Sequence, residues 1–89
     1  MKKMNIDVYT SNTNSGKHIS APAGVDVVPF ASTVAATDPD YASLKTFKKN
    51  LTIQAGGTRI AIDEDDVIAQ IEARGFALHK TSISFTVNV

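Results

Sequence analysis

Four consecutive acidic residues, Asp63 to Asp66, form the densest cluster of potential metal-ligating side chains in this sequence. Hard cations such as Ca²⁺ and Mg²⁺ take several oxygen ligands at once. Successive side chains on a helix diverge by about 100°, however, so these four carboxylates cannot converge on one ion. Carboxylates also stabilise the amino-terminal end of a helix by facing the positive end of its dipole. The cluster therefore predicts a helix start, and we expect neither a metal site nor a cofactor.

The two imidazoles, His18 and His79, are potential bases for a serine nucleophile such as Ser15 or Ser20. No nucleophile-elbow sequence surrounds either serine. Neither histidine is followed at helical spacing by a second metal ligand. We therefore interpret both as surface histidines and expect a protein that is not an enzyme.

Two glycine-containing segments have spacings that bear on phosphate binding. Ser15-Gly16-Lys17 departs twice from the P-loop pattern, because Ser11 stands where a Gly is required and His18 stands where a hydroxyl side chain is required. Gly56-Gly57 is typical of a tight turn between antiparallel strands rather than of a dinucleotide-binding turn. Neither segment predicts a nucleotide cofactor.

A local basic patch is the strongest electrostatic feature. It comprises Lys45, Lys48, Lys49 and Arg59. Single-stranded nucleic-acid sites combine such cations with stacking aromatic rings, and Tyr9 and Tyr41 are the candidates for those rings. The formal net charge is zero, which removes the long-range attraction to phosphates. Nucleic-acid binding is therefore the second hypothesis for function.

Residues 81–89 alternate strictly between apolar and uncharged polar side chains, which predicts a strand. The polar side consists of Ser82, Ser84, Thr86 and Asn88. Edge strands are usually protected against foreign pairing by Lys, Glu, Pro or a bulge, and the sequence shows none of these residues here. We expect this strand either to be central in its sheet or to pair with a partner chain, with the four polar residues as the interaction site.

Hydrophobic periodicity locates the earlier elements. Apolar and polar residues alternate from Met4 to Tyr9, which predicts an opening strand. Residues 10–24 are mostly polar or small, so we expect a flexible loop there, and such a loop would suit a lid over a small-molecule ligand. Val25 to Ala31 predict a second strand, which Pro29 would restrict to a sheet edge.

A helix and a hairpin are predicted next. Asp38-Pro39-Asp40 is typical of a helix start, and we expect this helix to run to about Lys49. Residues 51–62 predict a hairpin around Gly56-Gly57, in a register that places every large apolar residue on one face.

A second helix is predicted to begin at Asp63 as its cap and to end at Gly75, with the last strand following Leu78. Together the elements predict an α+β fold: a small, mainly antiparallel sheet of about four strands with two helices packed on one face. The chain of 89 residues, without cysteine, is long enough for a single small domain spanning residues 1–89.

Composition and charge argue against some locations and classes of function. No segment approaches the roughly 20 apolar residues of a membrane span, and Met1-Lys2-Lys3 is not followed by an apolar signal core, so we expect a cytoplasmic protein without a membrane partner.

Neutral charge and small size favour recognition of a partner by surface shape. The leading hypothesis is a non-enzymatic protein–protein interaction module that binds another protein or itself. It would be a self-assembling structural subunit or a small adaptor or inhibitor, of the kind found among phage or mobile-element accessory proteins. The alternative is a nucleic-acid-binding accessory protein.

Overall fold

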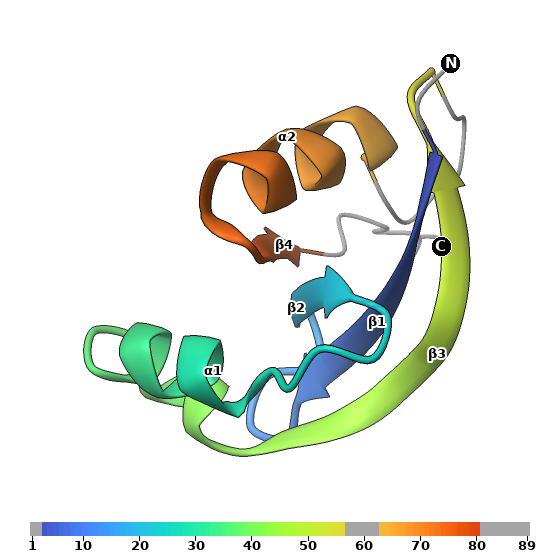
Figure 1. The fold of residues 1–89 in the computed structure, drawn as a ribbon. Coiled ribbons are helices and arrows are strands. Elements are labelled where there is room, and N and C mark those ends of the chain that lie inside the picture. The colour runs from blue at the N-terminus through green and yellow to red at the C-terminus, as the bar shows by residue number, and fades with distance from the viewer. Residues whose placement is uncertain (1–2, 57–62, 81–89) are drawn as a thin grey trace, which may run out of the picture.

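The computed structural model describes residues 3–56 and 63–80. The elements, in chain order, are β1 (Lys3–Ser11), β2 (Lys17–Pro22), α1 (Val28–Ala35), the 3₁₀ helix η1 (Pro39–Ala42), β3 (Leu44–Gln54), α2 (Glu64–Arg74) and β4 (Ala77–Lys80). The four strands form one antiparallel sheet in the order β3-β1-β2-β4 (Figure 1). The expected α+β class and the antiparallel sheet are confirmed, and the opening strand lies where the alternation predicted it.

The central strands β1 and β2 are buried on both faces. One face, called here the α2 face, carries Ile6 and Val8, which pack with the apolar stripe of α2. Side chains alternate along a strand, and the residues between them face the other way. This second face, called here the α1 face, carries Ile19 and Ala21, which pack with residues of α1 and η1.

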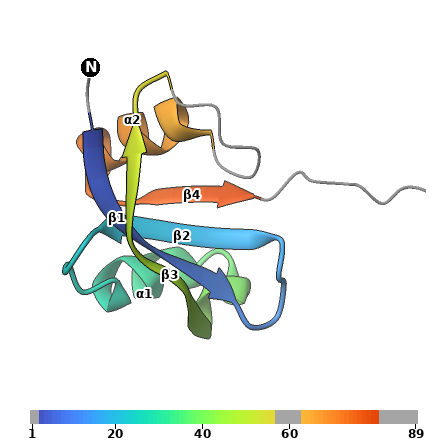
Figure 2. The same ribbon diagram turned by 90° about the vertical axis from the view of Figure 1, so that its right-hand side faces the viewer.

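The two helices therefore lie on opposite faces of the sheet, whereas we expected both on one face (Figure 1 and Figure 2). The physical reason is that polar side chains within β1 and β2 are buried with hydrogen-bond partners. Asp7 is 2% exposed and Ser20 is fully buried, although alternation assigns such residues to a wet face. Strands of a sheet that is covered on both sides do not alternate strictly between polar and apolar residues, and the expectation of two helices on one face depended on that alternation.

The expected loop over residues 10–24 is corrected, because this segment contains β2, the partner of β1 in a hairpin. Within β2, Ile19 and Ala21 are fully buried. The polar residues of this segment suggested a loop, but their side chains form hydrogen bonds inside the protein. Thr10 and His18, for example, share a hydrogen bond of 2.9 Å between Oγ1 and Nδ1. Residues 17–22 are therefore paired within the sheet rather than part of an open loop.

The strand expected over residues 25–31 is also wrong, since residues 28–35 form α1. Pro29 lies in the first turn of this helix, where a missing backbone N–H costs nothing. The buried side of α1 is anchored by Val27, just before the helix, and by Ala31.

The long helix expected from Asp38 to about Lys49 is replaced by η1 and β3. Its start is as expected, because the Asp38 carboxylate accepts a hydrogen bond of 3.1 Å from the Asp40 N–H. The chain then becomes extended at Ser43, and β3 pairs with β1 along its length. Pairing across the sheet outweighs local helix propensity, which is a weak preference.

Helix α2 has the predicted caps. The Asp63 carboxylate accepts a hydrogen bond of 3.1 Å from the Asp66 N–H, and Gly75 ends the helix with a left-handed φ of 91°. Two further acids of the cluster accept hydrogen bonds from the end of β3 and the turn after it: Glu64 from Gln54 N at 3.0 Å and Asp65 from Gly56 N at 2.8 Å. The predicted hairpin partner strand and the terminal strand fall in residues 57–62 and 81–89, outside the described residues.

Candidate functional site

The predicted strand-pairing residues, Ser82, Ser84, Thr86 and Asn88, lie outside the described residues, as does Arg59. The strand that leads toward them, β4, lies at one edge of the sheet and pairs with β2 alone among the described strands. Its backbone is partly covered on the outer side. The Gln70 side chain of α2 donates from Nε2 to the Leu78 carbonyl at 2.9 Å and accepts at Oε1 from the Leu78 N–H at 3.0 Å.

Strand β3 carries the three lysines of the predicted basic patch and divides them between the two faces. Lys45 and Lys48 are the register partners of Thr10 and Val8, which lie on the α2 face of β1. In an uninterrupted strand, residues three apart would point to opposite faces. The register shift between Val8 and Tyr9 in the β1–β3 pairing brings these two lysines to the same face.

Phe47 lies beside these two lysines. The register passes from Tyr9 to Val8 while skipping Phe47, which makes it the extra residue of a bulge. Its ring centroid is 5.6 Å from that of His18, which pairs with Thr10 and so lies on the α2 face. The side chain is 60% exposed. Sequence reasoning missed this surface aromatic because it predicted a helix through this segment, and no local sequence pattern indicates a bulge.

Lys49 has a structural role on the opposite face. Its ammonium lies 3.0 Å from the buried Asp7 carboxylate and 3.3 Å from the Tyr9 hydroxyl. The same carboxylate accepts hydrogen bonds from the N–H groups of Asn50 at 2.8 Å and Gly24 at 3.0 Å. Burial raises the pKa of Asp7, but these bonds and the lysine together outweigh burial and leave the pKa below its usual value. Lys49 is therefore not available as a free cation.

The two histidines form a cross-strand pair, whereas we expected surface residues. His18 and His79 are register partners, and their rings stack with centroids 5.4 Å apart. His18 is 6% exposed. Each ring has a hydroxyl partner: Nδ1 of His18 lies 2.9 Å from Thr10 Oγ1, and Nε2 of His79 lies 2.7 Å from Ser20 Oγ. Among the described residues, Nδ1 of His79 is buried without a partner.

The electrostatics of this pair keep both rings neutral near pH 7. Burial lowers the pKa of His79 to about 4, with a further decrease from the neighbouring His18 and an opposing contribution from Asp66. Burial also lowers the pKa of His18. Ser20 has the hydrogen bond that a nucleophile–base pair needs, but it is fully buried, so a substrate does not reach its hydroxyl in this conformation. The geometry supports a packing role for these residues.

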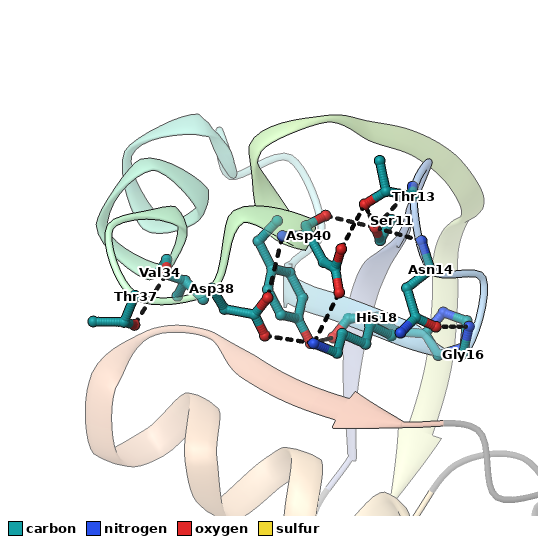
Figure 3. A network of polar contacts seen from close by, with 11 residues as sticks. Ser11, Thr13, Asn14, Gly16, His18, Val34, Thr37, Asp38 and Asp40 are labelled. Atoms are coloured by element: carbon teal, nitrogen blue, oxygen red, sulfur yellow. Dashed lines mark hydrogen bonds and ion pairs between the residues drawn. The ribbon is translucent and has the colours of Figure 1, made fainter.

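A polar network fixes the β1–β2 turn to η1, as Figure 3 shows. The Lys17 ammonium lies 2.8 Å from a carboxylate oxygen of Asp38 and 3.0 Å from one of Asp40. Hydrogen bonds to these two carboxylates raise the pKa of Lys17. The Thr13 hydroxyl donates to Asp40, and the Ser11 hydroxyl donates to the Asp40 carbonyl. All three charged groups are paired within this network, which explains the Ser15-Gly16-Lys17 region without a phosphate ligand.

An open hollow of about 530 Å³ lies between α1 and the start of β3. Its lining is mainly apolar and comprises Tyr9, Val27, Val28, Ala31, Ser32, Ala35, Tyr41, Ala42, Leu44 and Thr46. Val28 is 61% exposed at its rim, although the side chain is large and apolar. We name this hollow the α1 groove.

Groups of metal ligands and membrane-spanning helices are absent from the described part of the chain. Within residues 3–56 and 63–80, no three or more His, Asp or Glu residues are grouped so that they could hold a metal ion. The helices found there are also too short or too polar to cross a membrane. In comparisons with known proteins, no family model, no curated protein and no solved structure matches this chain.

Proposed function

We propose that this protein is a non-enzymatic protein-interaction module that receives an apolar segment of a partner chain in the α1 groove. The observation that carries the proposal is the groove itself, an open and mainly apolar hollow with Val28 exposed at its rim. Exposed apolar surface costs free energy in water, and its burial is the main driving force of protein association.

The shape and lining of the groove support a protein segment as its occupant. Charged residues, which anchor a polar metabolite, are missing from its lining, and its polar residues are Tyr, Ser and Thr. Tyr9 contributes a half-buried ring with a polar tip, a combination that is enriched at protein interfaces, whereas Tyr41 is buried with its hydroxyl bonded to the His18 carbonyl. The partner is a second copy of this chain or another protein.

The uncharged residues Ser82, Ser84, Thr86 and Asn88 remain a second proposed site of contact with a partner protein. Support comes from β4, which lies at a sheet edge and leads into these residues. An extended segment can join such an edge through main-chain hydrogen bonds. Gln70 covers the outer backbone groups of Leu78, so pairing with a partner would begin at Lys80.

The groove is tested with Val28→Glu, which places a charge at the rim of the apolar hollow. Thr33→Glu is the matched control, because Thr33 is exposed on the same helix and does not line the groove. Light scattering over a wide concentration range reports self-association, and affinity capture from the native host with mass-spectrometric identification reports a foreign partner. We expect the complex to persist with Thr33→Glu and to be lost with Val28→Glu. A wild-type monomer whose captured proteins do not differ from those of Val28→Glu would refute the proposal.

Strand pairing is tested separately with the double variant Ser84→Lys and Thr86→Lys. Two ammonium groups on the polar side of a strand disfavour addition of a second strand. If residues 81–89 mediate self-association, the double variant has a lower mass in solution than the wild type. Equal masses of the double variant and the wild type would show that these residues play no part in self-association.

A further inference from the structure

The α2 face of β3 presents an aromatic ring between two cations. Lys45, Phe47 and Lys48 share this face because of the register shift at Phe47 described above. All three side chains are exposed. Within residues 3–56 and 63–80, neither lysine forms an ion pair or a side-chain hydrogen bond, in contrast to Lys49 with its buried carboxylate partner.

The Phe47 ring is supported on one side by His18, and the side chain is otherwise largely exposed. Its contact with His18 is tilted, with 46° between the ring planes, and His18 is itself fixed by the stacked ring of His79. A ring supported in this way loses little freedom when a ligand packs on it. Edge protection explains lysines and bulges on an outer strand, but it gives no reason to expose a phenyl ring between them.

We infer that Lys45, Phe47 and Lys48 bind single-stranded nucleic acid, with one base stacked on Phe47 and flanking phosphates on the two lysines. Stacking on an aromatic side chain needs a base whose π-face is free, which a strand in a duplex does not offer. Lys45 is two residues from Phe47, about 6.6 Å along a strand, and Lys48 directly follows Phe47, so the cations lie within reach of the phosphates on either side of one stacked base. The net charge of zero makes the contact local and sensitive to salt.

The test uses fluorescence anisotropy of a labelled oligothymidylate of about 15 nucleotides, of random-sequence RNA of the same length and of a DNA duplex, all at low salt. We expect wild type to bind the single strands more tightly than the duplex. Phe47→Leu keeps an apolar side chain without a stacking face, and we expect it to weaken binding at least about fivefold. Lys45→Gln with Lys48→Gln should reduce the steepness of log K against log salt by about 1.4, the value for two lost phosphate contacts.

Lys3→Gln with Lys80→Gln is the charge-matched control, since both lysines are exposed on other strands. This double variant should retain the wild-type salt slope, and circular dichroism should show that all variants are folded. Three results would overturn the inference: wild type binding neither single strand, equal affinity for duplex and single strand, or equal losses in the two lysine double variants. Retained affinity in Phe47→Leu would also overturn it, because stacking would then contribute nothing.

Discussion

The side-chain amide of Gln70 bonds both backbone groups of Leu78, donating to its carbonyl at 2.9 Å and accepting from its N–H at 3.0 Å. Leu78 pairs with Ile19 on its other side, so this amide takes the place of a further strand. Asp66 and Arg74 hold the amide from neighbouring turns of α2. A side chain thus protects the β4 edge at a position where other proteins place a charge.

Replacing Gln70 with Met tests this protection, because Met keeps the length and helix preference of the side chain but makes no such hydrogen bonds. We expect the free energy of unfolding to fall by about 1–3 kcal/mol, since two backbone groups lose their partner. Urea denaturation measures this loss. Light scattering should show more self-association in Gln70→Met. Unchanged stability together with an unchanged mass would show that water replaces the amide at no cost.

Replacing Asp7 with Asn tests the buried carboxylate that joins β3 to the loop after β2. The variant loses the ion pair with Lys49 and weakens the bonds from Asn50 and Gly24, so we expect a loss of about 2–3 kcal/mol at pH 7. The pKa of Asp7 is lower in the folded protein than its usual 3.8. Its stabilisation is therefore complete above the unfolded pKa and lost as the pH falls through the folded pKa.

The Asp7 prediction is checked by urea denaturation at pH 7 and near pH 3. The difference in stability between wild type and Asp7→Asn should shrink at the lower pH, because the carboxylate of the unfolded chain takes up a proton at higher pH than that of the folded protein. A difference that is independent of pH would contradict a charge-based role and leave only a packing role for this side chain.

Stability should also decrease between about pH 6.5 and about pH 4 because of the histidine pair. Both rings have a lowered pKa, that of His79 reaching about 4, so the unfolded chain takes up protons before the folded protein does. The stabilising effect of the neutral rings is complete above pH 6.5 and declines as the pH falls toward 4. Burial causes most of this shift, and Asp66, which faces His79 from α2, opposes it.

The histidine prediction is measured by urea denaturation at closely spaced pH values, with His79→Gln as the variant that cannot titrate. Its stability should depend less steeply on pH across this window, while Asp7 contributes at lower pH only. An identical slope in the two proteins would place the titrating group elsewhere.

Gly75 ends α2 with φ of 91°, a conformation that is strained for a residue with a Cβ. We expect Gly75→Ala to destabilise the protein by about 1–2 kcal/mol. A Cβ added there would lie 3.4 Å from Cζ of Phe30, an ordinary contact, so backbone strain is the main cost. Gly75→Asn is the control, because Asn tolerates the left-handed region better. Thermal unfolding compares the two, and a greater loss with Asn than with Ala would show that space rather than φ decides.

The surfaces proposed to be functional were only partly predictable. Spacing along the sequence placed Lys45, Lys48 and Lys49 together, but it did not separate the third lysine, which neutralises a buried carboxylate. It also missed Phe47, because the exposure of that ring follows from a bulge formed against β1. The α1 groove brings together residues of β1, α1, η1 and β3, and no local pattern predicts such a combination.

The sequence by itself determined the elements whose signals are local: the alternating strand β1, the cap of α2 at Asp63 and its end at Gly75. These features depend on neighbouring residues and on backbone sterics. Tertiary structure alone decided that residues 17–22 form a buried strand, that the helix expected after Asp38 gives way to β3, and that the helices cover opposite faces. Each of these outcomes depends on partners distant in sequence, because pairing and buried hydrogen bonds outweigh local preferences of a few tenths of a kcal/mol per residue.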